Sequence, residues 1–329
     1  MTIQITVIGL DPVGISCGLA LQNHEKDLLR IGSDVDLGLE QKALKLKAFD
    51  RCIHNLGNAV ENADIILLNQ PVDELHSLLE AIADQLKTGA VILSTAPLHV
   101  QVLAWAQTLL PAERYLLTFT PSGNPAYADL ANSAAEPRAD LFAKGSVVIG
   151  AGPEAHPDAV RLAADLAGML SAKPMYFDPY EADGVLAFAH LLPYLNAAVI
   201  ARATAGQAGW KESRKLAGRA FLLATEPLAA PAENKELGTY ALLNGQNALR
   251  TLDATLFELS ALRELIASQD EEGLRAYLET ATDLREAWIK ARETGQWDKV
   301  DTPPMPSMGD QLTKMFWFSK PGKEQNKKD

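Results

Sequence analysis

The chain has 329 residues, 47% of them hydrophobic and 22% charged, which is enough for two globular domains with a sizeable core. Its net charge of −12 argues against nucleic acid or an anionic membrane surface as a partner, because both attract basic patches. Two cysteines are too few for a disulfide framework and the first residues lack the pattern of a signal peptide, so we expect a cytoplasmic protein.

The first half of the chain alternates short apolar runs with helical periods. The apolar runs predict strands at residues 3–8, 28–34, 63–71, 90–95, 115–121 and 145–151, the last of them the final strand. Helical periods lie at residues 12–22, 37–47, 74–86, 100–110 and 158–170. This alternation is typical of a parallel sheet covered on both faces. We therefore expect a Rossmann-type α/β domain with a parallel-rich sheet over residues 1–178.

The second half shows helical periods and no convincing strand. Apolar residues recur at helical spacing in residues 253–266, and a further helix is expected over residues 270–292. These periods predict an all-helical domain over residues 179–300. The most apolar run, residues 185–201, is too short and too interrupted by polar residues for a membrane span, so we expect a buried helix there.

The last segment, residues 301–329, has the composition of a tail. Within it Met308, Leu312, Met315 and Phe316 keep helical spacing. We expect a short amphipathic helix that docks on its own subunit or a sister subunit, with a binding motif for another protein as the alternative.

A near-complete dinucleotide fingerprint opens the chain. In VIGLDPVGISCGLAL (residues 7–21), Gly9 and Gly14 hold the first and last glycine positions of G-x-G-x-x-G, and Asp11 stands at the middle one. Asp34 closes the second predicted strand, where an acid accepts hydrogen bonds from ribose hydroxyls and repels a 2′-phosphate. The sequence therefore predicts an NAD site, with NADP disfavoured; an aspartate of an ordinary turn is the alternative for Asp34.

Asp11 followed by Pro12 is also a strong helix start, with the aspartate as the cap and the proline at the first helical position. A capping Asp11 would accept a hydrogen bond from the backbone N–H of Val13 or Gly14, the donors that a pyrophosphate would use. Pro12 also removes one N–H from this turn. The hypothesis is a well-formed loop that binds the cofactor weakly.

Several segments, in order and spacing, resemble the prephenate/arogenate dehydrogenase family of tyrosine biosynthesis. Besides the fingerprint, they are IGSD (31–34), ADIILLNQP (63–71), ADLFAKGSVVIGAG (139–152), DPYEADGVLAFAHLLPYLNAA (178–198) and GWKESRKLAG (209–218). The resemblance implies an NAD(P)-binding domain, an all-α dimerisation domain of the 6-phosphogluconate dehydrogenase type, a homodimer, and an active site in the cleft between the domains. It further implies that a small carboxylate, prephenate or arogenate, loses a hydride and its ring carboxylate.

The family's functional residues are only partly retained. Its arginine in G-[FW]-x-x-x-x-R falls on Arg214, which the resemblance implies as a clamp for a substrate carboxylate. The H-P-M-A-G loop reads T-P-S-G-N, so Thr120 stands in place of the catalytic histidine, and the lysine of D-x-x-S-x-K becomes His99. Aligned by its proline, S-H-L-P-H puts His190 at the serine and Tyr194 at the last histidine. His190 is then the candidate base, with Tyr194 and His99 as candidate substrate contacts; packing roles are the alternative for each.

Three functions stay open on this reading: a working dehydrogenase, a non-catalytic relative that keeps the fold and dimer, and an oxidoreductase with a different substrate. The changes at Asp11 and Thr120 favour the second, while Asp34 and Arg214 favour ligand binding in every case. No group of cysteines and histidines has metal-ligand spacing, so no metal is expected. The sequence does not choose between prephenate and arogenate.

Overall fold

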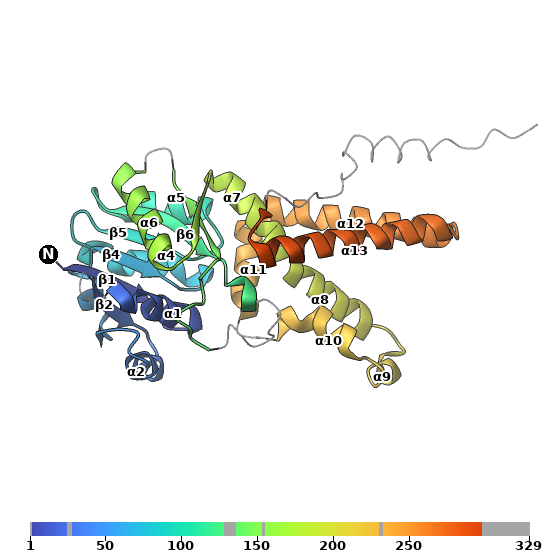
Figure 1. The fold of residues 1–329 in the computed structure, drawn as a ribbon, viewed down its shortest axis with the longest axis horizontal. Coiled ribbons are helices and arrows are strands. Elements are labelled where there is room, and N and C mark those ends of the chain that lie inside the picture. Colours follow the sequence, from blue (N-terminus) through green and yellow to red (C-terminus); the bar gives the residue numbers. More distant parts are fainter. Residues whose placement is uncertain (1, 25–27, 128–135, 153–154, 230–232, 298–329) are drawn as a thin grey trace, which may run out of the picture. The chain divides into compact units, whose positions relative to one another are not determined.

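The computed structural model describes residues 2–24, 28–127, 136–152, 155–229 and 233–297 (Figure 1). The chain forms two compact units that are divided after Glu258. The expected amphipathic helix of the 301–329 tail lies outside the described residues.

An eight-stranded sheet is the frame of the first unit. Its order is β3-β2-β1-β4-β5-β6-β7-β8, and every neighbouring pair is parallel except β6 and β7. The strands are β1 (Ile3–Ile8), β2 (Leu28–Ser33), β3 (Arg51–Cys52), β4 (Ile65–Leu68), β5 (Val91–Ser94), β6 (Tyr115–Pro121), β7 (Ser146–Gly150) and β8 (Lys173–Phe177). The predicted parallel-rich α/β fold is confirmed.

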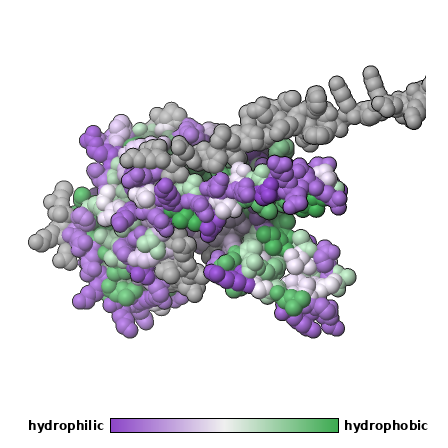
Figure 2. All heavy atoms as spheres, turned by 45° about the vertical axis from the view of Figure 1, so that its right-hand side comes forward, coloured by the Kyte–Doolittle hydropathy of each residue, from purple (hydrophilic) through white to green (hydrophobic). Residues whose placement is uncertain are grey.

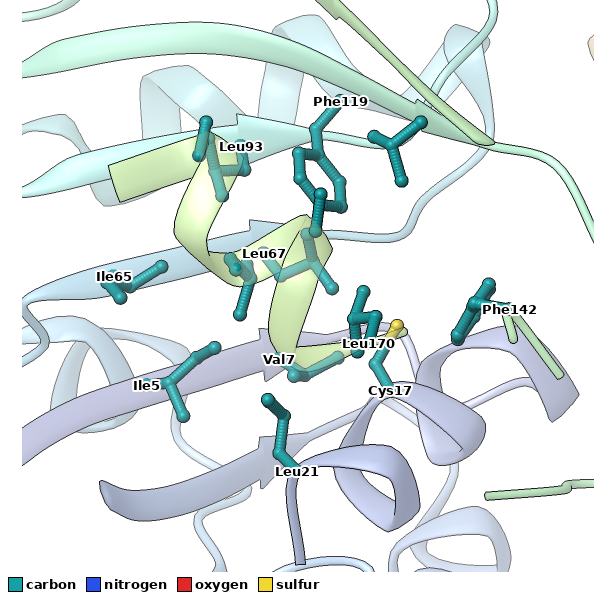
Figure 3. Close-up of a cluster of buried hydrophobic side chains, with 14 of the residues drawn as sticks. Ile5, Val7, Cys17, Leu21, Ile65, Leu67, Leu93, Phe119, Phe142 and Leu170 are labelled. Carbon is teal, nitrogen blue, oxygen red and sulfur yellow. The ribbon is translucent and has the colours of Figure 1, made fainter. Parts of the chain in front are cut away.

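Helices cover both faces of this sheet. They are α1 (Pro12–Ala20), α2 (Leu37–Lys45), α3 (Leu56–Val60), α4 (Val72–Ile82), α5 (Val100–Leu109) and α6 (Pro157–Met169), with short 3-10 turns at Leu21–His24, Ala83–Gln85 and Pro125–Tyr127. Alternate strand residues face opposite sides, so Ile5 and Val7 pack with α1 and α6 (Figure 3), while Ile66 and Leu68 pack with α4 and α5. The central strand β4 is therefore apolar on both sides.

The structure contains three elements that the sequence patterns did not predict: β3, α3 and β8. Both β3 and α3 are too short, at two and five residues, to show a period. Strand β8 ends the sheet, so the expectation that residues 145–151 form the final strand is wrong. Most of β8 is exposed and it contains Pro174, so it lacks the continuous apolar run of a buried strand.

The remainder of the described chain is helical, as expected. It comprises α7 (Pro179–Leu186), the π-helix η5 (Ala187–Leu191), α8 (Leu192–Ala205), α9 (Trp210–Ser213), α10 (Arg219–Thr225), the 3-10 turn η6 (Glu226–Leu228), α11 (Glu233–Leu243), α12 (Gly245–Ala267) and α13 (Glu271–Thr294). Helix α13 begins where Asp270 accepts a hydrogen bond from the Gly273 N–H at 2.8 Å.

The expected buried helix at residues 185–201 lies within the continuous helical stretch Pro179–Ala205. By length and composition alone this stretch would suffice to cross a membrane, yet only 28% of its most apolar window is buried. Leu191 and Ala197 are buried, whereas Val199 and Ile200 are exposed. The expectation of a buried helix is therefore wrong for the part of the helix surface that carries Val199 and Ile200, which is exposed in the single chain. Figure 2 shows apolar side chains gathered on the surface of these helices.

Candidate functional site

The turn between β1 and α1 needs glycine at two positions. Gly9 has φ +96°, and a Cβ there would lie 1.9 Å from the carbonyl oxygen of Asn69. A Cβ on Gly14 would lie 1.9 Å from the carbonyl oxygen of Gly9. Close packing within the turn therefore requires glycine at both outer positions of the fingerprint.

Asp11 closes this turn. Its Oδ1 accepts hydrogen bonds from the Gly14 N–H at 2.8 Å and from Asn69 Nδ2 at 2.7 Å. Desolvation by the surrounding protein raises the pKa of Asp11, and the hydrogen bonds from Gly14 and Asn69 oppose this shift. The predicted cap is confirmed with Gly14 as the donor, so a phosphate at the N-terminus of α1 would compete with the protein's own carboxylate.

Asn69 is a contributor that the sequence patterns did not indicate. It follows β4, and its Oδ1 accepts a hydrogen bond from Thr95 Oγ1 at 3.1 Å, which orients its amide nitrogen toward Asp11. A polar residue directly after a buried strand was the available signal, since the carboxyl ends of parallel strands meet at one edge of the sheet.

Asp34 lies at the carboxyl end of β2, half-buried. Its Oδ2 accepts a hydrogen bond from the Leu10 N–H at 2.6 Å and its Oδ1 accepts one from the Asp36 N–H at 2.8 Å. A carboxylate oxygen can accept a second hydrogen bond, so a ribose hydroxyl can still donate to Asp34. A dinucleotide therefore fits this edge of the sheet at its adenosine end, on the condition that Asp11 yields the Gly14 N–H to the phosphates.

His99 and Thr120, both candidate site residues, meet in a buried network. His99 Nε2 lies 3.1 Å from Thr120 Oγ1, and His99 Nδ1 lies 2.8 Å from Thr118 Oγ1. Thr120 donates its own hydroxyl hydrogen to the Ala96 carbonyl at 2.8 Å, so we assign the Nε2–H tautomer to His99. Burial lowers the pKa of His99 to about 4, which keeps the ring neutral.

This network is closed to ligands. His99 is 0% exposed and Thr120 is 5% exposed. Gly150 packs against the ring so closely that a Cβ there would lie 2.3 Å from His99 Nδ1. The structure thus places the His99 imidazole against Thr120 and buries that ring as a structural group.

Asp183 of α7 fixes the segment that carries His99. Its Oδ1 accepts a hydrogen bond from the His99 N–H at 2.5 Å, and its Oδ2 accepts one from the Val100 N–H at 3.1 Å. It therefore caps α5 from a distant helix, and Asn244 Nδ2 donates to the Asp183 carbonyl at 3.1 Å. Burial raises the pKa of Asp183. An acid inside an apolar helical run was the sequence signal for this residue.

A cavity of about 140 Å³ lies where helices meet the loop after β5. Its lining residues are Pro97, His190, Tyr194, Glu236, Leu237 and Tyr240. Tyr240 is 3% exposed, and its hydroxyl makes no hydrogen bond within the described part of the chain. Desolvation lowers the pKa of His190, so this ring is neutral at physiological pH. Two predicted site residues, His190 and Tyr194, thus share one cavity.

His190 lies in the π-helix η5. A π turn holds one more residue than an α turn, and such turns are frequent at functional sites.

Arg214 is not brought to this cavity. It follows α9, it is exposed, and no residue of α9 lines the cavity. The fourteen residues of α8 separate α9 from His190 by roughly 21 Å along the helix axis. In the described residues, no group of three or more His, Cys, Asp or Glu side chains is placed to hold a metal ion.

Comparisons with known proteins extend over both halves of the chain. The family model of the prephenate dehydrogenase nucleotide-binding domain matches residues 17–175, and that of the prephenate dehydrogenase dimerization domain matches residues 178–280. The chain is 24% identical over 317 residues to the prephenate dehydrogenase of Bacillus subtilis strain 168, covering 94% of this chain and 83% of that protein. It is 27% identical over 288 residues to the cyclohexadienyl dehydrogenase of Zymomonas mobilis, covering 86% and 94%.

Solved structures share the fold. The prephenate dehydrogenase of A. aeolicus in complex with hydroxyphenyl propionate and NAD+ superposes with a TM-score of 0.75 at 16% identity, covering 87% of this chain and 98% of that chain. The arogenate dehydrogenase of Synechocystis gives a TM-score of 0.69 at 21% identity, covering 87% and 100%. A Rossmann-type half followed by a helical half is therefore an architecture that this chain has in common with both.

Proposed function

This chain belongs to the prephenate dehydrogenase family, and on that premise we propose that it oxidises a cyclohexadienyl carboxylate with NAD and releases the ring carboxylate as CO2. The cavity that holds His190 carries this proposal. It lies at the carboxyl end of β5, where open α/β sheets bind ligands, and it presents a neutral imidazole beside two phenols. The ligand pair of the A. aeolicus structure supports a site for an aromatic carboxylate and NAD.

The residues of the cavity have separable roles in this reaction. His190 accepts the proton of the ring hydroxyl as the carbinol becomes a carbonyl. Bound NAD supplies the acceptor for the carbinol hydride. The electron pair of the bond to the departing carboxylate then completes the aromatic ring, and the resulting phenolate oxygen takes the proton back from His190, so the products are a phenol and CO2. Tyr194 and Tyr240 hold the substrate by hydrogen bonds and need not change protonation state.

The pKa of His190 fits this role. Because desolvation lowers this pKa, the neutral base persists below the pH at which an ordinary histidine becomes half protonated. Activity is then lost only as the pH falls through the lowered value. The acid limb of kcat/KM lies correspondingly below 6.5.

The proposal includes NAD as the cofactor and a homodimer. Asp34 favours NAD, since its carboxylate would repel a 2′-phosphate. The match to the family's dimerization domain and the exposed apolar side chains of the helical region support pairing of two chains. These side chains include Val199, Ile200, Leu222, Leu223, Leu249 and Leu256.

The direct test follows NADH absorbance with prephenate and with arogenate. We expect turnover with at least one of them, and His190→Ala should lower kcat by about a hundredfold or more, because a positioned base contributes that much. His24→Ala removes a histidine that lies outside the cavity and serves as the control. Absence of NADH formation with either substrate would overturn the proposed activity, and unchanged turnover in His190→Ala would remove this residue from the reaction.

The second candidate is a non-catalytic relative that binds a carboxylate ligand. Asp11 at the phosphate position and the buried Thr120 in place of a histidine favour it. This alternative predicts binding of an aromatic carboxylate, measured by calorimetry, with no NADH formed.

A further inference from the structure

We infer that residues 308–318, near the C-terminus of the chain, dock as an amphipathic helix on one face of α13 of the same chain. This docking goes beyond the proposed function, because neither segment lines the cavity that holds His190. Three features lead to it: the pattern of a groove on α13, the charges of the two segments, and the length of chain that joins them.

A groove of about 430 Å³ runs along α13. Its seven lining residues lie between Glu271 and Asp283 and recur at i, i+3, i+4, i+7, i+8, i+11 and i+12. These positions form one continuous face of a helix, which is the face that a second helix covers. Leu274 and Leu278 lie in the middle of the groove, and Leu278 is 54% exposed. The groove therefore offers apolar side chains to a second helix.

The segment 308–318 has a pattern that matches this groove. Met308, Leu312, Met315 and Phe316 recur at i, i+4, i+7 and i+8, which would put four apolar side chains on one side of a helix. Amphipathic helices that dock in apolar grooves use anchors at this spacing. The segment can therefore cover the leucines of the groove with one row of its own side chains.

The charges of the two regions are opposite. Residues 314–328 contain five lysines and one glutamate, a net charge of +4, in a chain whose net charge is −12. Residues 270–286 contain six acids and two arginines, a net charge of −4. Within the described residues, none of Glu271, Glu279 and Asp283 forms a salt bridge. The acids that line the groove are therefore available to the lysines.

The connecting chain is long enough for the segment to fold back. Helix α13 ends at Thr294, and Gly295 follows with φ +67°, a left-handed conformation that turns the chain away from the helix axis. Asp283 lies eleven residues before Thr294, roughly 17 Å along the axis. The ten residues 298–307 can span up to about 33 Å. A segment that folds back runs antiparallel to α13, so its lysines approach the acidic start of that helix.

Hydrogen exchange on the full chain, measured by mass spectrometry, tests the docking. Leu278→Asp puts a carboxylate in the middle of the groove and should speed the exchange of residues 308–318 by about tenfold or more. Leu242→Asp changes a leucine that is 84% exposed and lies outside the groove, so it should leave this exchange unchanged. Phe316→Asp alters the segment and not the groove, and it should speed the exchange of residues 271–283.

Cross-linking identifies the chain on which the segment docks. In a Cys52→Ser background, a short bismaleimide should join Thr282→Cys to Gln311→Cys within one chain. This reaction should be about tenfold faster than that of Thr280→Cys with Gln311→Cys, because Thr280 lies on α13 but outside the groove.

Three results would overturn the inference. The first is exchange of residues 308–318 that is equally fast in the unmodified chain and in Leu278→Asp. The second is equal cross-linking from positions 280 and 282. The third is a cross-linked dimer, which would place the segment on α13 of a second copy. None of these results bears on the proposed function, which is tested separately by NADH formation.

Discussion

The turn after β1 and the cavity beside α8 and α11 differ in whether their buried polar groups are hydrogen-bonded within the chain. In the turn, the Gly14 N–H and the Asn69 amide are both satisfied by Asp11, within the chain itself. In the cavity, the buried hydroxyl of Tyr240 has no partner in the described residues. The hydrogen bonds of the turn are therefore made without a ligand, whereas the Tyr240 hydroxyl gains a partner only when a ligand binds in the cavity.

This difference determines how each site responds to a ligand. A phosphate at the turn replaces hydrogen bonds that already exist and meets a carboxylate, so the net gain is small. A ligand in the cavity satisfies a group that burial has left unpaired, so the full hydrogen bond contributes to affinity. We therefore expect a ligand to gain more from the cavity than a phosphate gains from the turn, and four experiments compare groups that are hydrogen-bonded within the chain with one that is not.

The largest effect is expected from Asp183→Ala. It leaves the His99 and Val100 N–H groups unpaired in a buried setting and should lower the free energy of unfolding by about 4 kcal/mol. Asp178→Ala, at an exposed cap on the same helix, should lower it by only about 1 kcal/mol. Urea unfolding measures both values, and equal losses would show that Asp183 is an ordinary cap.

The next effect concerns the pH dependence of stability through His99. Its folded-state pKa of about 4 lies below the ordinary 6.5, so the unfolded chain takes up a proton that the folded chain excludes. The contribution of neutral His99 to the free energy of unfolding is fully present above pH 6.5. It falls by roughly 3 kcal/mol as the pH drops toward 4. An NMR titration should show the neutral Nε2–H ring through this range, and half-protonation near 6.5 would contradict the buried network.

A smaller effect is expected from Asp11→Gly. Removal of the carboxylate frees the Gly14 N–H and should tighten NAD binding by about tenfold, measured by calorimetry. Asp270→Gly is the matched control, because Asp270 caps α13 through a Gly N–H at the same 2.8 Å. Both variants should lose only about a few tenths of a kcal/mol of stability, because glycine is itself tolerated as a helix cap, and only the first should gain affinity. Unchanged NAD affinity would mean that Asp11 does not occupy the phosphate position.

The smallest effect is expected from Tyr240→Phe, and it has the opposite sign. Loss of an unpaired buried hydroxyl should raise the stability of the free protein by about 1 kcal/mol and weaken ligand binding. Tyr180→Phe, at an exposed tyrosine of α7, should change neither quantity. A loss of stability in Tyr240→Phe would show that the hydroxyl is already satisfied in the free protein.

The sequence by itself determined the local architecture of this protein. The alternation of apolar strands and helices predicted the sheet, and Asp11-Pro12 predicted a cap that the structure contains. These features can be predicted because the hydrophobic period, the helix cap and the glycine turn each depend on residues within a few positions of one another. The two strands and the helix that were not predicted are short or exposed, so they carry little of that local signal.

Only the tertiary structure decided how the site is assembled. Asp183 caps α5 across 84 positions, and Asn69 reaches Asp11 across 58. Both His99 and His190 were candidate site residues from the sequence, but packing buries His99 and places His190 at the cavity. Burial and long-range hydrogen bonds follow from the order of the strands and from the surface that each helix covers, which no short stretch of sequence encodes. For that reason the turn after β1 could be predicted from fifteen consecutive residues, while the cavity that holds His190 could be found only in the folded chain.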